Sequence, residues 1–416
     1  MSVRRESLSA LLCGLLLCVC EGVLEAQPAA RTALERFHDA RRLSGDWGGW
    51  RSKWEEAGLR FDIFYNHFSG HKGYGGASPT PEWQNSGSLD LFARFDLDRA
   101  NLRPGGEILV HVKSNWSRNI NPAIGALSDP IDDADGNFSL YLYQIWYQRP
   151  WLDNKLVMRA GYIDQQSLFD RNAFANTEDL QFLNTYLDNN PVLPVLNGFG
   201  AALIYNPTDW MSIVSAVSDG EATIRKFNLN TAFNGDFNYR RYAEVDFRGR
   251  IPVGETALDG NYRFGFVDDP IDLPRIAAGG IATSNQRAYF SGDQMLYAEP
   301  NGVGQGLGVF ARYGYQQGSV HRIEHFVSGG MQYAGLFPRR DLDTLGVAFY
   351  RAISSKRYRL FVDPTFDQET GYEFYYALQT SAATVLSPDL QYIDQPGGHL
   401  GAKGVWVFNL RLRLTL

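Results

Sequence analysis

Cysteine is nearly absent from this chain of 416 residues, and its three cysteines, Cys13, Cys18 and Cys20, all lie close to the N-terminus. The rest of the chain can therefore form neither a disulfide framework nor a thiolate metal site. Long apolar runs are also missing beyond this region, where no stretch approaches the roughly 20 apolar residues that a transmembrane helix needs. Transmembrane strands, which need only about 9–11 residues each, are not excluded.

A strong charge of one sign is the second feature that the sequence lacks. It has 39 Lys and Arg residues against 46 Asp and Glu residues, which gives a formal net charge of −7 at pH 7. Proteins that bind nucleic acids usually carry a basic surface, so we expect no nucleic-acid partner. Aromatic residues, by contrast, make up 14% of the chain, and glycine occurs 42 times. This composition is compatible with membrane strands joined by tight turns.

The N-terminus has the pattern of an export signal. Arg4 and Arg5 precede an apolar run from Leu8 to Val19, which is too short to cross a bilayer as a helix. We predict a signal peptide over residues 1–26, with cleavage near Ala26. A lipoprotein anchor is the alternative, but neither Cys18 nor Cys20 follows the small residue that such a site prefers.

Residues 27–58 are the only helix-leaning part of the exported chain. The helical pattern covers Arg31 to Arg42 and then Trp50 to Ala57, after which Gly58 is suited to end a helix. We expect a short helical segment on the periplasmic side of the protein.

From residue 59 onward the pattern changes to the two-residue alternation of strands with one apolar face. Apolar side chains alternate with mainly polar or charged ones in a series of short segments, for example 59–66, 89–97, 108–113, 242–248 and 307–313. The last segment, 406–416, keeps this alternation to the final residue. About sixteen such segments lie between Leu59 and Leu416, each near the length of a tilted membrane strand. An apolar outer face at the very end of the chain suits a last strand that faces lipid and closes on the first.

The links between these segments also favour a membrane barrel. Short links such as 206–209 contrast with long ones at 69–85, 118–137, 164–197 and 219–238, which we expect to be extracellular or to fold inward. We therefore predict an all-β protein, a transmembrane antiparallel up-and-down β-barrel over residues 59–416. A secreted β-sandwich or propeller is the alternative, since its sheets also alternate. The aromatic apolar faces and the lack of a 40–50-residue repeat favour the barrel.

Two local patterns partly match motifs of metal-binding proteins, but each lacks a feature that the motif requires. Residues 321–325 match H-x-x-E-H, a zinc-peptidase motif that requires a helix, but they lie between two predicted strands. The acidic stretch 129–136 suggests calcium, yet an EF-hand loop with Gly136 at its sixth position would need acidic residues at Ile131 and Leu142. No Ser-His-Asp arrangement is legible. We expect no catalytic residue, no metal and no cofactor, with a lipase-like outer-membrane enzyme as one alternative.

The residues that follow the predicted leader resemble a known family. Leu43–Arg51 reads L-S-G-D-W-G-G-W-R and is followed by E-E-A-G at residues 55–58. This opening is similar to that of the carbohydrate-selective porins of the OprB type. Further agreement lies at 161–164, 169–170, 174–176, 181–184, 386–393 and 396–398. The resemblance covers roughly residues 40–416. It implies a barrel of about sixteen strands in the outer membrane of a Gram-negative bacterium, narrowed by inward loops, through which glucose-like sugars diffuse.

The polar faces of the predicted strands supply candidates for the lining of such a pore. Charged side chains can replace water around sugar hydroxyls, and an inward aromatic residue such as Phe92 can stack on the apolar face of a sugar ring. Mixed charges along the lining argue against strong ion selectivity. A structural charge ladder that merely solvates the lumen explains the same residues equally well. The candidates are Asp90, Arg94, Lys113, Arg159, Glu244, Arg248, Arg312 and Arg411.

The expected partners are small carbohydrates, the lipid of the outer membrane and, during biogenesis, the barrel-assembly machinery. Only about 30 residues separate the predicted leader from the first strand, too few for the plug domain of an active transporter, so we expect passive flux. The sequence leaves open whether the barrel is a monomer or a trimer. A general or anion diffusion porin remains an alternative function.

Overall fold

The structure is a computed structural model that describes residues 41–133, 136–194, 197–223, 225–254, 256–277, 279–300 and 304–416. The predicted signal peptide over residues 1–26 lies outside the described residues, as does most of the helical pattern before Arg42. The expected short N-terminal helix is confirmed. It is α3 (Trp50–Glu56), preceded by the 3-10 turn η1 (Trp47–Gly49). Among the described residues, none of the helices has the length and apolar character to cross a membrane.

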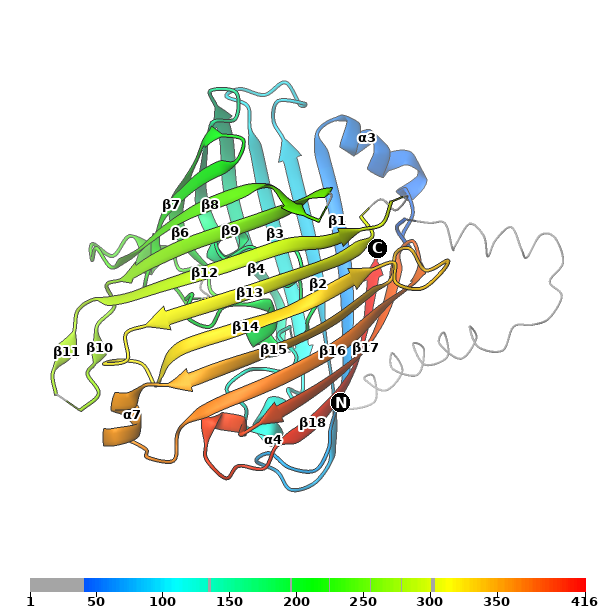
Figure 1. Cartoon of the computed structure of the whole chain (residues 1–416). Helices are drawn as coiled ribbons and strands as arrows, with labels where there is room; N and C mark the ends of the chain where they lie inside the picture. The colour runs from blue at the N-terminus through cyan, green and yellow to red at the C-terminus, as the bar shows by residue number, and fades with distance from the viewer. Residues whose placement is uncertain are drawn as a thin grey trace, which may run out of the picture.

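Within the described residues, sixteen antiparallel strands form a closed barrel, as predicted. Figure 1 shows the strands running obliquely around it. The barrel strands are β1 (Leu59–Lys72), β2 (Glu82–Asp96), β3 (Glu107–Ser117), β4 (Phe138–Trp151), β5 (Leu156–Asp164), β6 (Asn197–Thr208), β7 (Met211–Asp219), β8 (Tyr239–Val253), β9 (Thr256–Asp269), β12 (Asn285–Ala298), β13 (Gly306–Gln316), β14 (Ile323–Ala334), β15 (Thr344–Ser354), β16 (Gln368–Ser381), β17 (Thr384–Asp394) and β18 (Val405–Thr415).

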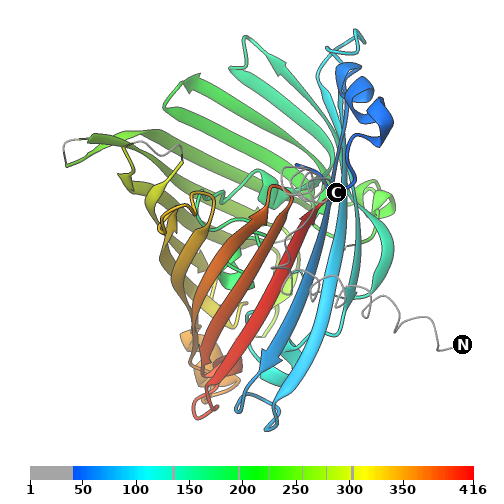
Figure 2. The same ribbon diagram turned by 90° about the vertical axis from the view of Figure 1, so that its right-hand side faces the viewer.

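The barrel closes because the last strand pairs with the first. β18 runs antiparallel to β1, with His67 opposite Leu412, and Figure 2 shows the two strands side by side. Arg51 of α3 secures this junction. Its guanidinium is 1% exposed and donates hydrogen bonds to the carbonyl oxygens of Gly45 (3.0 Å) and Leu416 (3.1 Å). The opening motif therefore ties the N-terminal segment to the end of the chain.

Consecutive strands are linked alternately at the two ends of the barrel. The end that holds α3 and Leu416, called here the turn end, has tight turns at 208–211, 253–256 and 381–384. The opposite loop end carries the long links. These contain the remaining short elements, namely α4 (Asn121–Ile124), η2 (Gln165–Ser167), α5 (Thr185–Asp188), α6 (Leu229–Ala232), β10 (Leu273–Pro274), β11 (Ile281–Ala282), α7 (Lys356–Phe361) and η3 (Pro396–Gly398).

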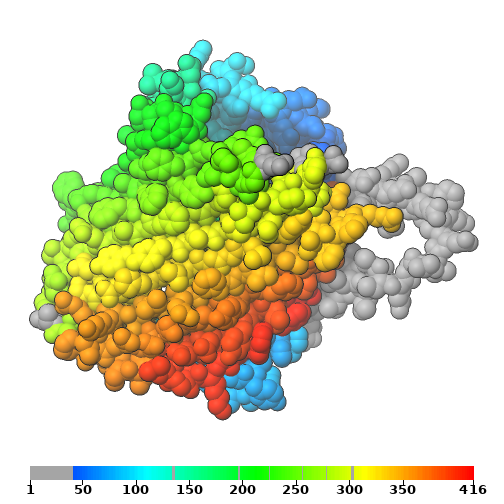
Figure 3. All heavy atoms as spheres, viewed as in Figure 1, coloured from blue at the N-terminus to red at the C-terminus, as the bar shows by residue number. Residues whose placement is uncertain are grey.

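The outer face of the wall is apolar and aromatic, as the alternation indicated. Trp406, at the start of β18, is 56% exposed, and Phe264, in the middle of β9, is 55% exposed, although both lie in paired strands. Arg411 and Arg413 of β18 point inward instead, where each contacts residues between β5 and β6. Figure 3 shows how continuously the strands cover this side of the molecule.

The interior of the barrel is partly filled by chain from the loop end. We define the first inward segment as residues 118–133 and the second inward segment as residues 165–194. Aromatic side chains of the second segment pack directly on the wall at glycines. A Cβ atom on Gly308 of β13, for example, would lie 2.1 Å from the ring of Phe174. The absence of a side chain at this position lets the segment approach the strand closely.

Candidate functional site

The second inward segment packs against one side of the barrel through an apolar core. Its buried side chains include Phe169, Phe182, Leu187 and Val192, all at 1% exposure or less. They belong to one cluster with inward residues of the strands from β8 to β17, among them Tyr242, Tyr289, Phe310, Phe326, Tyr350 and Tyr375. This half of the lumen is therefore a packed core and leaves little room for solutes.

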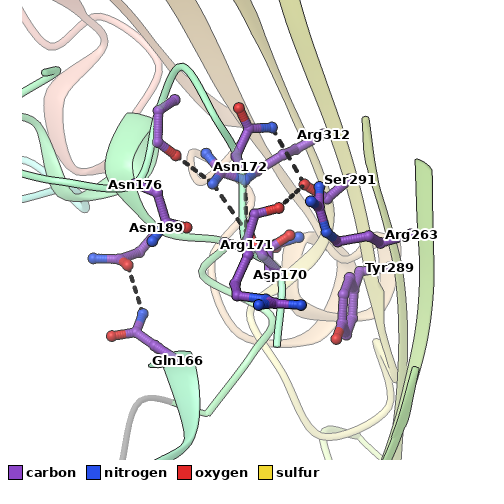
Figure 4. A network of polar contacts seen from close by, with 12 residues as sticks. Gln166, Asp170, Arg171, Asn172, Asn176, Asn189, Arg263, Tyr289, Ser291 and Arg312 are labelled. Atoms are coloured by element: carbon purple, nitrogen blue, oxygen red, sulfur yellow. Dashed lines mark hydrogen bonds and ion pairs between the residues drawn. The ribbon is translucent and has the colours of Figure 1, made fainter. Parts of the chain in front are cut away.

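Arg312 of β13 is a central polar anchor for this segment. Its side chain is buried, and its Nη1 donates a hydrogen bond to the carbonyl oxygen of Leu187 (2.7 Å). Its Nε lies 3.0 Å from a carboxylate oxygen of Asp170. Figure 4 shows Asp170 and its neighbour Asn172 close to Arg312 and to Ser291 of the wall. A buried pair of this kind holds two chain segments in a single geometry.

Three further wall residues bind the backbone of the second inward segment. Glu373 of β16 accepts hydrogen bonds from the amides of Leu183 (2.5 Å) and Asn184 (3.0 Å). Glu244 of β8 accepts one from the amide of Asp170 (2.9 Å), and Arg411 of β18 donates one to the carbonyl of Gln181 (2.9 Å). Charged side chains of the wall thus satisfy backbone groups that would otherwise be buried without partners.

The first inward segment crosses the lumen and meets the second one. Glu369 of β16 accepts hydrogen bonds from the amides of Leu127 (2.6 Å) and Ser128 (3.1 Å). The amide of Thr185 donates to the carbonyl of Asp129 (2.9 Å), and the amide of Asp132 donates to the carbonyl of Leu183 (3.1 Å). The two segments therefore form one unit inside the barrel.

The open part of the lumen lies along the opposite side, beside β1 to β6. It contains a cavity of about 610 Å³, within the size range of small-molecule sites. Phe64 of β1 and Phe92 of β2 line this cavity and also a neighbouring one that reaches Arg60, Arg94 and Glu107. Those three residues in turn border the cavity at the turn end, next to α3. Each cavity shares lining residues with the next, so together they outline a path from the first cavity to the turn end.

The cavity beside β1 to β6 is strongly acidic. Lys113 is its only lysine, no arginine lines it, and the described lining residues include eight carboxylates, Asp90, Asp129, Asp132, Asp133, Asp164, Glu178, Asp179 and Asp188. Burial raises the pKa of Asp129 to about 7. Burial and the neighbouring carboxylate of Asp188 raise the pKa of Glu178 well above its usual range. The alternation of the strands predicted a mixture of basic and acidic side chains along the lining, whereas acidic side chains predominate in this cavity.

Two of the eight candidate lining residues reach this cavity. Asp90 lies 2.8 Å from Nε2 of His111, and Lys113 lies 2.5 Å from Asp133 of the first inward segment. The ring of Phe92 stacks on His111, with 3.8 Å between ring centroids. Hydrogen-bonding groups and an aromatic face therefore stand side by side.

The other candidates lie elsewhere. Arg94 is at the narrower cavity toward the turn end, 3.2 Å from Glu107. Arg248 lines a separate cavity of about 290 Å³. Arg159 is placed 4.1 Å above the ring of Trp146. Glu244, Arg312 and Arg411 are 1–2% exposed and bind the second inward segment.

The alternation of the strands gives no indication of the carboxylates that the inward segments bring into the cavity. These residues lie in links, which have no alternation, and they are Asp129, Asp132, Asp133, Glu178, Asp179 and Asp188. The acidic stretch 129–136 was the available signal. The H-x-x-E-H motif does not assemble, because His325 contacts Tyr313 and Tyr315 on the outer face, whereas the charges of Arg287 and Asp269 act on His321.

Comparisons with known proteins agree with this geometry. Residues 81–416 match the family model described as carbohydrate-selective porin, OprB family. Porin B of Pseudomonas aeruginosa is 22% identical, covering 91% of this chain and 92% of its own. The putative porin QuiX of Acinetobacter baylyi is 23% identical, with 91% and 93% covered. The high-pH structure of Pseudomonas putida OprB superimposes with a TM-score of 0.81 at 19% identity, covering 91% of this chain and 99% of that one.

Proposed function

Because the chain belongs to the OprB family of carbohydrate-selective porins, which are outer-membrane channels and not enzymes, we propose that it admits small neutral sugars such as glucose by passive diffusion. The observation that carries this proposal is the cavity beside β1 to β6. Carboxylates, Lys113 and the aromatic faces of Phe64 and Phe92 line it together. A sugar presents hydroxyls that both donate and accept hydrogen bonds, and its ring has apolar faces. The cavity therefore offers a partner for each part of a sugar.

The acidic lining of the cavity favours the passage of neutral solutes over that of anions. A sugar acid would approach eight acidic side chains with one lysine among them, whereas the hydroxyls of glucose can donate to the ionised carboxylates and accept from the protonated ones. This favours a sugar channel over an anion porin. Hydrogen bonds to charged groups contribute only about 1.5–3 kcal/mol each, so a sugar can bind and still leave.

We propose that the eight candidate lining residues have different roles. Asp90, Lys113, Arg94 and Arg248 act on the passing sugar, because each borders an open cavity. Glu244, Arg312 and Arg411 act as positioning residues, because they hold the second inward segment against the wall. Arg159 supports the wall near Trp146.

The membrane context completes the proposal. We propose that residues 1–26 are removed on export, that residues 27–58 lie on the periplasmic side and that residues 59–416 span the membrane with lipid around the aromatic outer face. The turn end would then face the periplasm, as in other outer-membrane barrels. Nucleic acid has no part in this function, and the barrel-assembly machinery inserts the chain.

The proposal can be tested by single-channel recording of the purified barrel in planar bilayers. Glucose should block the ion current in a concentration-dependent manner, and succinate and phosphate should do so less. Stronger block by the anions than by glucose would indicate an anion porin. The absence of block by any solute would indicate general diffusion.

A further inference from the structure

Three carboxylates from the two inward segments meet in the acidic cavity. They belong to Asp132, Glu178 and Asp188, and one oxygen of each lies within 4.8 Å of the other two. Asp132 comes from the first inward segment, whereas Glu178 and Asp188 come from the second. Like charges at such short separation repel strongly unless something compensates them.

No basic side chain of the described residues forms an ion pair with these three carboxylates. Among the described residues, the ion pairs of the neighbouring basic side chains go to other partners. Lys113 is 2.5 Å from Asp133, and Arg413 is 2.5 Å from Asp179. Arg312 pairs with Asp170. No Lys, Arg or His nitrogen of the described residues lies within 4 Å of the three carboxylates.

Asp188 gives an independent indication that a ligand belongs here. It is the last residue of α5 and is 4% exposed, and its Oδ1 is buried without a hydrogen-bond partner in the part of the chain described. A buried carboxylate oxygen without a partner is rare in folded proteins, because its lost hydration is not replaced. A bound cation would replace it.

Asp132, by contrast, is already oriented. Its two carboxylate oxygens accept hydrogen bonds from Oγ1 of Thr185 (2.9 Å) and from Nδ2 of Asn189 (2.7 Å). Each oxygen retains a further lone pair for a metal ion. Hydrogen bonds of this kind from neighbouring groups are typical around metal-ligating carboxylates.

We propose that Asp132, Glu178 and Asp188 form a calcium site that joins the two inward segments inside the lumen. Three carboxylates are hard oxygen ligands, which suit Ca²⁺ and Mg²⁺. A set of three protein carboxylates favours Ca²⁺, because Mg²⁺ usually keeps several waters and binds only one or two carboxylates. The acidic stretch that suggested calcium in the sequence supplies only Asp132, and the other two ligands lie 46 and 56 residues further along the chain.

The site has a structural consequence that goes beyond sugar passage. A cation bound at these three residues would connect the first and second inward segments by more than their hydrogen bonds. Ca²⁺ binding should therefore stabilise the folded barrel against heat.

The test is isothermal titration of Ca²⁺ into the purified, chelator-treated barrel, freed of lipopolysaccharide. We expect one Ca²⁺ per chain and weaker binding of Mg²⁺. Asp188→Asn should weaken Ca²⁺ binding about tenfold or more. Asp209→Asn serves as the matched control, because Asp209 is exposed in a tight turn and loses the same charge.

Several results would overturn the proposal. The first is that the wild-type barrel binds no Ca²⁺, and the second is that it binds Mg²⁺ as tightly as Ca²⁺. The third is that Asp188→Asn and Asp209→Asn weaken Ca²⁺ binding equally. If Asp188→Asn does not fold, Glu178→Gln replaces it with the same expectation. The thermal midpoint of the wild-type barrel with Ca²⁺ and with chelator gives a second readout, and equal midpoints would contradict the site. None of these measurements depends on which solute the channel admits.

Discussion

At the scale of single residues, Arg94 and Arg312 show how the same side chain can serve two purposes in one barrel. Arg94 lies at an open cavity, has an exposed partner in Glu107, and is free to meet a solute. Arg312 is enclosed by carbonyl oxygens and by the carboxylate of Asp170. Both residues occupy inward positions of strands, so the alternation alone could not distinguish them. The difference arises from where the inward segments lie.

Replacing Arg94 with Ala should weaken sugar block without unfolding the barrel. Its ion pair with Glu107 is partly exposed, and such pairs contribute roughly 0–1 kcal/mol to stability. The guanidinium donors that could bind sugar hydroxyls would be lost. Single-channel block by glucose should show a higher half-blocking concentration. Arg250→Ala, at an exposed pair near a tight turn, is the control and should match the wild type.

His321 should make stability depend on pH. It lies in the link between β13 and β14, where burial first and then the charge of Arg287 lower its pKa from 6.5 to about 4, against the opposing effect of Asp269. Between these values the unfolded chain binds the proton and the folded protein does not. The stability that neutral His321 contributes is therefore present above pH 6.5 and is lost as the pH falls toward 4.

The measurement is the thermal midpoint at about pH 7 and about pH 5 for the wild type and His321→Gln. The wild-type midpoint should fall further than that of the variant, whose side chain stays neutral. An equal fall in both proteins would show that His321 does not carry this dependence.

At the scale of elements, the strands were predictable and the inward segments were not. The alternation of apolar and polar residues in β1, β2, β3 and β18 reports directly which face meets lipid, so the strand number and the inward position of Arg411 followed from the sequence. The segments 118–133 and 165–194 have no such period, because they are held by long-range contacts with strands far away in the chain. The carboxylates that they bring to the cavity therefore escaped prediction, whereas Asp90 and Lys113 did not.

The orientation of β18 can be tested with two adjacent substitutions. Leu412→Arg would place a charge on the lipid-facing side and should destabilise the barrel by about 2–4 kcal/mol near the bilayer midplane. Arg411→Gln should leave the barrel folded but loosen the second inward segment, because the hydrogen bond to Gln181 is lost or weakened. The yield of folded protein and the mobility change on gels after boiling would show which of the two variants impairs folding of the barrel. Equal defects, or the reverse order, would contradict this strand orientation.

The packing of the second inward segment depends on Arg312. Arg312→Ala would leave the carboxylate of Asp170 buried without its partner, a change that typically destabilises by about 3–5 kcal/mol. We expect the segment to detach while the hydrogen-bonded wall stays closed, so single-channel conductance should rise and block by glucose should fall. The control is Arg359→Ala, which removes a partly exposed ion pair on α7. A conductance like that of the wild type would show that Arg312 is not needed to hold the segment.

At the scale of the whole molecule, the barrel combines a packed half and an open half. The strands from β8 to β17 support the second inward segment, and the strands from β1 to β6 border the cavities that lead toward the turn end. The cross-section available to a solute is thus set by the segment and not by the strand number. This arrangement explains how a barrel of sixteen strands can select small solutes, since an empty barrel of that size leaves a wide aqueous channel.

Membrane insertion should be visible in the purified protein. The aromatic outer face and the closed hydrogen-bonding of the wall predict that the protein fractionates with the outer membrane and changes its mobility on gels when boiled in detergent. Recovery from the periplasm as a soluble protein without this mobility change would contradict the membrane assignment.

The most direct test of the central claim is liposome swelling with the reconstituted barrel. A carbohydrate-selective, passive channel should admit glucose faster than tetraethylene glycol, which has similar mass and no charge but lacks the ring and its array of hydroxyls. It should admit gluconate more slowly than glucose, because the cavity is acidic. Equal swelling rates for glucose and tetraethylene glycol would show a general diffusion pore and contradict the claim.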